Sequence, residues 1–174
     1  KEDPKVEEIL VNMMKKSLEE EDDDVVEMAQ ESVTEFLIVN KRYEVNINGE
    51  NTPILQYYTN ALDSPNSRVA ENASEAMKSI APLYQEDIWP ILESKIMGKN
   101  EEVARDCMHT LALLGEKIHA EVDLGLLYDM SKHKNPSTRA EAIFALGMIA
   151  DHRDIDEKPI FARLSDKDPT VRLE

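Results

Sequence analysis

Residues 135–150, NPSTRAEAIFALGMIA, contain the pattern that decides the predicted fold. Counted from Thr138, small residues follow at four and seven positions, and larger apolar residues follow at eight and eleven positions. These intervals fall on one face of an α-helix, and the small residues allow a neighbouring helix to approach closely. Asn135 and Pro136 are typical of a helix start, because the Asn side chain accepts a hydrogen bond from a free backbone N–H and proline has no N–H to satisfy. The segment therefore predicts an amphipathic helix that begins after Asn135.

The same pattern recurs along the chain, and its last copy is incomplete. The copies begin at Val25, Val69, Val103, Thr138 and Val171, at spacings of 44, 34, 35 and 33 residues. Their positions four, seven, eight and eleven hold Ala29, Ser32, Val33 and Phe36, then Ala73, Ala76, Met77 and Ile80, then Cys107, Thr110, Leu111 and Leu114, then Ala142, Ala145, Leu146 and Ile149. An Asp or Asn stands three residues before each copy, namely Asp22, Asn66, Asn100, Asn135 and Asp168. We expect these Asp and Asn residues to cap helices.

A second apolar stretch lies upstream of each predicted cap, so the repeating unit is a helix, a short turn and a helix. The unit is about 34 residues long, a length found in helical repeat proteins. One such hairpin cannot bury its apolar faces alone, so we expect successive hairpins to stack and share a continuous core. Pro90 lies inside one of the upstream stretches and predicts a bend there.

The hairpins resemble HEAT repeats, particularly the short HEAT-like variety. The residues that carry the resemblance are 166–172, DKDPTVR, and 135–150. The resemblance implies an all-α fold, a right-handed α-α superhelix (HEAT-like solenoid) of about five helical hairpins, the last truncated. We expect a single array over residues 1–174, with repeats at approximately 4–39, 52–81, 86–118, 121–152 and 156–174 and an insert at 40–51. The earlier copies lack the Arg that follows the first residue of the last two copies, and in its place they hold Val26, Ala70 and Ala104. We therefore expect the ladder of Asp and Arg that joins such repeats to be incomplete.

The insert at residues 40–51, NKRYEVNINGEN, accounts for the spacing of 44 residues. In it Tyr43, Val45 and Ile47 alternate with polar residues, and Asn48-Gly49 is a strong turn signal. The insert is either a long loop or a small β-hairpin. A role in binding and a tolerated insertion without a role both stay open.

Residues 19–24, EEEDDD, are predicted to form a solvated turn. Residues 19–21 finish one helix and its connection, and Asp22 caps the next helix. Asp23 and Asp24 lie in the first turn of that helix, where its dipole favours negative charge. A calcium loop needs alternating oxygen ligands around a central Gly, which six adjacent carboxylates do not provide. The alternative is a weak site for a cation or for a basic partner.

The sequence contains no recognisable catalytic or metal-binding motif. His109, His119, His133 and His152 are scattered, and none has a second ligand three or four residues away. Cys107 holds an inward position of the repeat and is predicted to be a buried structural thiol. We therefore predict a protein that is not an enzyme, with no catalytic, cofactor-binding or metal-binding residues and no cofactor. The alternative is an enzyme or enzyme subunit that resembles the HEAT-like bilin lyases.

The formal net charge of the chain is −16, and residues 1–40 contribute 13 acids and 4 bases. Direct binding of nucleic acid needs clustered Lys and Arg, which the sequence lacks, so we expect no nucleic-acid partner. No export signal and no apolar run long enough for a membrane span is present, which predicts a cytoplasmic (intracellular) protein with no membrane partner. An acidic surface favours a protein partner with a basic segment.

The HEAT-like resemblance implies binding through the concave ridge formed by the second helix of each hairpin. Positions two, five and nine point outward, and in the first two copies they hold the polar residues Glu27, Gln30, Thr34, Glu71, Ser74 and Lys78. In the third and fourth copies they hold the candidate partner-binding residues Arg105, Met108, Ala112, Ala140, Ile143 and Gly147. These residues either form a shallow apolar groove for a partner helix or pack against neighbouring repeats.

From these observations we predict a non-catalytic protein–protein interaction scaffold or adaptor. A structural segment of a larger assembly is a further alternative, because residues 171–174 break off where a helix should begin. A continuation of the repeat array beyond both ends is therefore left open.

Overall fold

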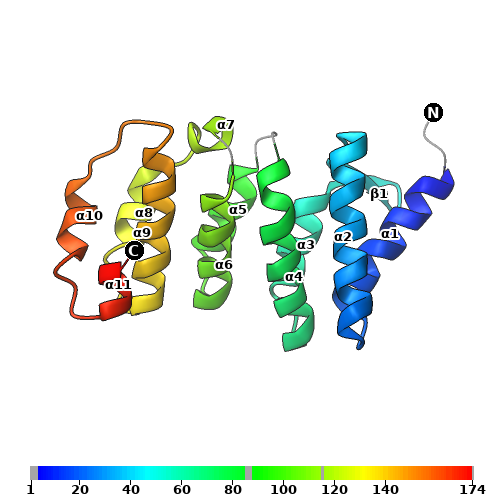
Figure 1. The fold of residues 1–174 in the computed structure, drawn as a ribbon, viewed down its shortest axis with the longest axis horizontal. Coiled ribbons are helices and arrows are strands. Elements are labelled where there is room, and N and C mark those ends of the chain that lie inside the picture. The colour runs from blue at the N-terminus through cyan, green and yellow to red at the C-terminus, as the bar shows by residue number, and fades with distance from the viewer. Residues whose placement is uncertain (1–3, 85–87, 115, 174) are drawn as a thin grey trace. The chain divides into compact units, whose positions relative to one another are not determined.

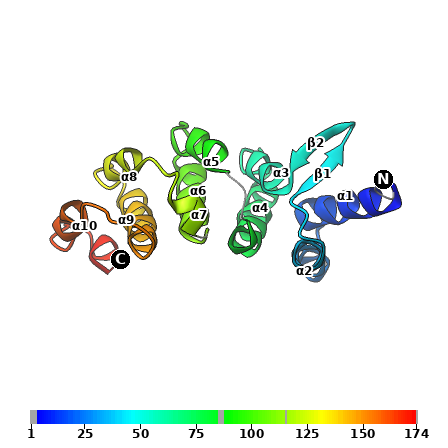
Figure 2. The same ribbon diagram turned by 90° about the horizontal axis from the view of Figure 1, so that it is seen from above.

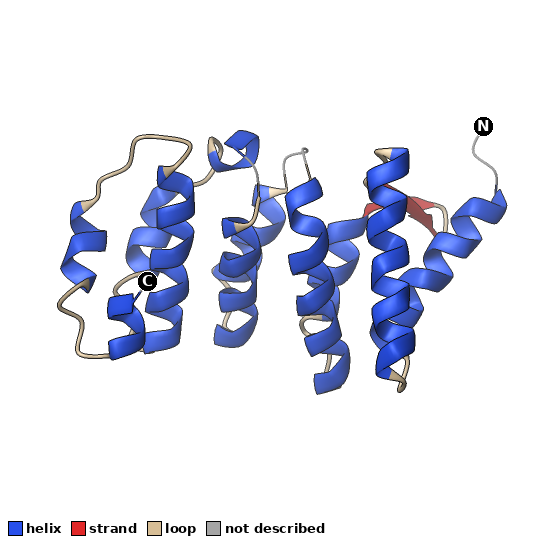
Figure 3. Ribbon diagram, in the orientation of Figure 1, coloured by secondary structure: helices blue, strands red, loops and turns tan. Residues whose placement is uncertain are grey.

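The computed structural model describes residues 4–84, 88–114 and 116–173. Helices dominate these residues, and their one pair of strands forms a small antiparallel sheet (Figure 3). The prediction of a mostly helical chain is confirmed. The residues divide into two compact units, Lys1–Tyr84 and Gln85–Glu174, which are described separately below. The prediction of one continuous array stays a prediction.

The first unit contains two helix pairs joined by a β-hairpin (Figure 1). Its elements are α1 (Pro4–Glu19), α2 (Asp23–Asn40), β1 (Glu44–Ile47), β2 (Glu50–Pro53), α3 (Ile54–Ala61), α4 (Ser67–Ile80) and the 3₁₀ turn η1 (Ala81–Leu83). Helix α1 packs against α2, α3 packs against α4, and α4 also contacts both α1 and α2. The two pairs therefore share one core.

The second unit contains three helix pairs and one short additional helix. Its elements are α5 (Trp89–Ile96), α6 (Glu101–Ala112), α7 (Glu116–His119), α8 (Leu124–Met130), α9 (Pro136–Ala150), α10 (Lys158–Arg163) and α11 (Pro169–Leu173). Helix α9 lies side by side with α6 and also contacts α8, α10 and α11. Pro90 occupies the first turn of α5, where its missing N–H takes no helical hydrogen bond, so the predicted bend is wrong.

The column of Asp and Asn residues caps the second helix of each pair, as predicted. The caps are Asp22, Asn66, Asn100, Asn135 and Asp168. In each case the side-chain Oδ1 accepts a hydrogen bond from the backbone N–H two residues later, at 3.0 or 3.1 Å. The acidic run 19–24 is confirmed as a turn, since α1 ends at Glu19 and Asp23 and Asp24 lie in the first turn of α2.

The core of each unit is built mainly from the repeated positions, and α2 departs most from the pattern. The small residues at position four, including Ala29 and Cys107, are all buried, which confirms the predicted buried thiol. In α2, however, the buried residues are Val26, Ala29, Val33 and Leu37. Ser32 and Phe36 were predicted to face the core and are only partly buried, because α2 turns their side of the helix toward an open groove beside α1.

The insert at residues 40–51 leads into a β-hairpin, so the loop alternative is wrong. Strands β1 and β2 pair antiparallel with Ile47 opposite Glu50, and Asn48 and Gly49 form the two-residue turn. Both turn residues have positive φ, 54° at Asn48 and 93° at Gly49, as this tight turn requires. Figure 2 shows the two strands beside α1 and α3, and the packing of β1 on α1 and β2 on α3 agrees.

Tyr84 joins the hairpin to the helices of the first unit. Its hydroxyl accepts a hydrogen bond from the backbone N–H of Leu55 at 2.7 Å and donates one to the carbonyl oxygen of Tyr43 at 2.9 Å. The Tyr43 and Tyr84 rings also contact each other, with centroids 5.1 Å apart. Tyr84 is 2% exposed and Leu55 is fully buried, so the hydrogen bond between them is shielded from water.

Replacement of Tyr84 by Phe should lower the free energy of unfolding of the first unit by about 1–3 kcal/mol, because the buried N–H of Leu55 would lose its acceptor. Tyr57→Phe is the matched control, since the Tyr57 hydroxyl has no hydrogen bond to any described residue. The control should change stability by less than about 0.5 kcal/mol. Chemical denaturation followed by circular dichroism measures both values, and equal losses in the two variants would contradict the role of Tyr84.

Candidate interaction surface

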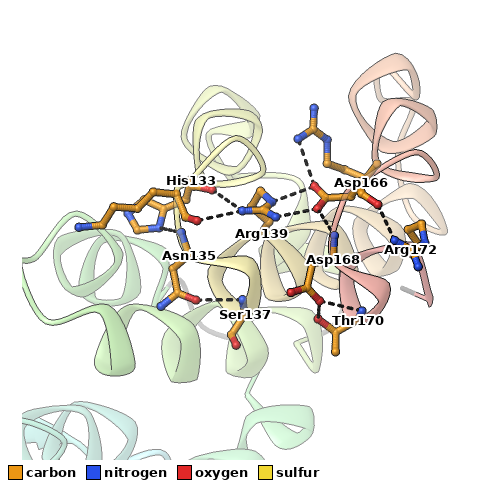
Figure 4. Close-up of polar contacts among 10 residues, drawn as sticks. His133, Asn135, Ser137, Arg139, Asp166, Asp168, Thr170 and Arg172 are labelled. Carbon is orange, nitrogen blue, oxygen red and sulfur yellow. Dashed lines mark hydrogen bonds and ion pairs between the residues drawn. The ribbon is translucent and has the colours of Figure 1, made fainter.

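Arg139 of α9 joins two turns of the second unit through a buried network (Figure 4). Its Nη1 donates to the carbonyl oxygens of His133 and Lys134 at 2.9 and 3.1 Å. Its Nε and Nη2 donate to the two carboxylate oxygens of Asp166 at 2.9 and 2.6 Å. The side chains of Arg139 and Asp166 are each only 5% exposed. This two-point contact holds the turn before α9 to the turn before α11.

The Arg139 guanidinium keeps Asp166 ionised. Its hydrogen bonds, together with the backbone N–H of Asp168, lower the pKa of Asp166 from 3.8 to about 2. Arg172 of α11 adds a hydrogen bond from Nη1 to the carbonyl oxygen of Asp166 at 2.7 Å. The Asp166 carboxylate and the Arg139 guanidinium therefore already have partners within the chain. We assign this network a structural role.

Arg68 of α4 plays a comparable part in the first unit. Its Nε and Nη2 donate to the carbonyl oxygens of Glu20 and Glu21 at 3.2 and 2.6 Å, and Nη2 also pairs with the carboxylate of Asp23. The acidic run therefore binds a cation from its own chain. The repeat pattern does not predict this role of Arg68, because it places Arg two positions later, where Ala70 stands, and nothing local distinguishes Arg68 from other surface arginines.

The six predicted partner-binding residues do not form an open surface. Arg105 and Ala140 are half-buried and Gly147 is exposed. Met108, Ala112 and Ile143 are at most 2% exposed. All three residues therefore pack inside the protein, as one of the two alternatives predicted. They do not line an apolar groove.

An open surface lies instead on α2, where three carboxylates line a wide trough. The trough has a volume of about 840 Å³ and is lined by Glu27, Gln30, Glu31, Ser32, Thr34 and Glu35 of α2 and by Ser79 of α4. We call it the acidic trough. It contains the outward residues Glu27, Gln30 and Thr34 of the first copy. The second helices of the first unit therefore supply an open surface at polar positions.

Two polar residues that line the acidic trough, Gln30 and Thr34, are held by hydrogen bonds. The Gln30 side chain donates to the carbonyl oxygen of Asn72 at 3.1 Å, and the Thr34 hydroxyl donates to the carbonyl oxygen of Gln30 at 2.9 Å. The three glutamates, by contrast, form no ion pair with any described residue. Their carboxylates are exposed on successive turns of one helix, so they are placed to accept several hydrogen bonds from a cationic ligand.

His109 and His119 have polar or ring contacts with other residues of the second unit. His109 stacks on Phe144 at 5.3 Å, and its Nδ1 lies 3.1 Å from Glu141. His119 is buried, its Nε2 lies 2.9 Å from the carbonyl oxygen of Leu111, and burial lowers its pKa. Among the described residues, no group of three His, Cys, Asp or Glu side chains has the arrangement of a metal site.

Comparisons with known proteins bear on the fold. No protein-family model and no curated protein matches this chain. The crystal structure of an engineered protein from the Northeast Structural Genomics Consortium is similar, with a TM-score of 0.57 and 17% sequence identity over 94% of this chain and 74% of that chain. At this identity the likeness concerns the fold alone. Within the described residues, none of the helices has both the length and the apolar character of a membrane span.

Acidification should test the Asp166 network. The pKa of Asp166 is lower in the folded protein than in the unfolded chain, so its stabilising effect is present above about pH 4 and is lost as the pH falls toward 2. The melting temperatures of the wild type and Asp166→Asn should therefore differ most near neutral pH and converge toward pH 2. Asp154→Asn, at an exposed carboxylate without a described partner, should follow the wild type at every pH. A constant difference between wild type and Asp166→Asn would refute the network.

Two of the predicted partner-binding residues provide a test of burial. Met108→Ala should lower the free energy of unfolding by about 2–5 kcal/mol, because it leaves a cavity in a fully buried position. Gly147→Ala should raise it by about 0.4–1 kcal/mol, since an added methyl meets no atom within 4 Å and the helix loses less chain entropy on folding. Urea denaturation of both variants gives the two values. Similar losses of stability in the two variants would show that Met108 and Gly147 do not differ in burial.

Proposed function

We propose that this chain is a non-catalytic protein-interaction scaffold that binds a partner through the acidic trough. The observation that carries the proposal is the row of Glu27, Glu31 and Glu35, three exposed carboxylates on one face of α2 without a cationic partner in the described residues. Like charges four residues apart on a helix repel each other and destabilise it by a few tenths of a kcal/mol per pair. A cationic partner would remove this repulsion on binding.

The surface around the trough supports a protein partner. The trough is wide and open, and its lining mixes carboxylates with the hydroxyls of Ser32, Thr34 and Ser79. A basic segment would gain charge-assisted hydrogen bonds here, and the net charge of −16 would speed its encounter with the surface. Because Gln30 and Thr34 are already held by hydrogen bonds, these side chains would lose little conformational entropy on binding.

We further propose that the helix pairs form a HEAT-like α-solenoid, in which the second helices provide the binding ridge. Two findings support this: the repeated caps and the packing of second helix on second helix within each unit. Such repeats contact mainly their neighbours, so the surface is preformed over its length. A preformed surface suits a scaffold, because its partner does not have to order it.

Charge reversal tests the proposed function. The full chain with Glu27→Lys and Glu31→Lys should lose the proteins that the wild type retains in affinity capture followed by quantitative mass spectrometry. Glu44→Lys with Glu50→Lys is the matched control, because both residues are exposed on the β-hairpin outside the trough and the change in net charge is the same. The control should retain the same proteins as the wild type. Equal retention by both double variants would exclude the trough as the binding surface.

A further inference from the structure

An apolar groove adjoins the acidic trough on the neighbouring side of α2. It has a volume of about 360 Å³ and is lined mainly by Val6, Ile9, Leu10 and Met13 of α1 and by Phe36 and Val39 of α2. Val6, Ile9 and Val39 are 40%, 53% and 67% exposed. Figure 1 shows α1 inclined to α2, and these residues lie on the N-terminal half of α1 and the C-terminal half of α2.

The groove exposes repeat positions whose residues are buried in the next three copies. Ser32 and Phe36 hold positions seven and eleven of the first copy and line the groove. The equivalent residues of the next three copies are all at most 3% exposed, namely Ala76 and Ile80, Thr110 and Leu114, and Ala145 and Ile149. The repeat pattern thus builds a face suited to packing, and in the first copy that face is accessible. Exposed large apolar side chains gathered in one groove are typical of a binding site.

Charge indicates the chemistry of the occupant. Ser32 and Glu35 line both the groove and the acidic trough, so the two surfaces meet along α2. From that edge Glu31 and Glu27 continue the row of carboxylates. An occupant that fills the groove therefore places its neighbouring side chains beside three negative charges. A second copy of this chain fits poorly, because residues 1–40 would bring a further 13 acids and only 4 bases.

We propose that the groove binds an amphipathic helix of a partner protein, with its apolar face against Ile9, Phe36 and Val39 and its Lys or Arg residues against Glu27, Glu31 and Glu35. The proposal rests on the proposed function, which assigns the trough to a protein partner, and adds the class of segment that binds. Apolar residues at intervals of three and four along the partner helix would enter the groove, and basic residues beside that stripe would reach the carboxylates. The apolar contacts would supply affinity, and the charges would select a basic helix over an acidic one.

A synthetic peptide tests the proposal. The ligand is a fluorescein-labelled amphipathic helix of about 14 residues made of Leu and Lys, long enough for three or four apolar anchors on one face. Binding to the full chain is followed by fluorescence anisotropy. Ile9→Ser with Val39→Ser should weaken binding by roughly tenfold or more, since two apolar contacts are lost. Because both residues are exposed, the melting temperature should stay close to that of the wild type.

Matched controls separate this groove from other apolar and acidic surfaces. Phe161→Ser with Leu164→Ser removes two apolar residues of similar exposure, 60% and 61%, from α10 and its C-cap, and should leave binding unchanged. Glu31→Gln with Glu35→Gln should weaken binding and reduce its dependence on salt, whereas Glu44→Gln with Glu50→Gln should do neither. A peptide with Glu in place of every Lys should bind at least tenfold more weakly than the Lys peptide.

Three results would overturn the proposal. Wild-type affinity in the Ile9→Ser, Val39→Ser variant would show that the groove takes no part. In that case a loss on Glu31→Gln, Glu35→Gln would leave the trough, and with it the proposed function, intact. Equal binding of the Lys and Glu peptides would exclude a basic partner. A wild-type dimer in sedimentation velocity that dissociates in the Ile9→Ser, Val39→Ser variant would assign the groove to a second copy of the chain.

Discussion

A helix pair exposes apolar surface that only a neighbouring element can cover, and this constraint governs both units. In the first unit, α4 packs on α1 and α2 as well as on α3. In the second unit, α9 contacts four other helices, so residues on several sides of it are buried. The same constraint explains why Met108 and Ile143 lie inside the protein, although helical spacing alone places them outside the repeated core stripe.

Polar contacts complete the assembly where the core ends. The caps satisfy the first backbone N–H groups of the second helices, and arginines bind the carbonyl oxygens of turns. Arg153 is a third example, since its Nη1 donates to the carbonyl oxygens of His119, Ala120 and Val122 at 3.0, 3.0 and 3.2 Å. A guanidinium suits this role because it carries several donors and a permanent charge. The contacts of Arg68 and Arg153 connect segments that are about thirty to fifty residues apart in the sequence.

Helix α2 combines two kinds of surface. One side carries the carboxylates of the acidic trough, and the adjacent side lines the apolar groove with α1. Its buried residues are confined to Val26, Ala29, Val33 and Leu37, a narrower stripe than that of α9. A helix packed on fewer sides keeps more of its surface available for a partner, and this places the proposed site in the first copy of the repeat.

The amino-acid sequence determined the helices, the caps and the two-residue turn at Asn48 and Gly49, because each depends on hydrogen bonds and conformations within a few neighbouring residues. Burial of the small residues at position four, Cys107 among them, also followed from helical periodicity. Only the tertiary structure decided which remaining faces are covered. Met108 became core while Phe36 became the wall of a groove, and Arg68 found its acceptors 45 to 48 residues away. These outcomes depend on the positions of neighbouring helices, which no local interval in the sequence encodes.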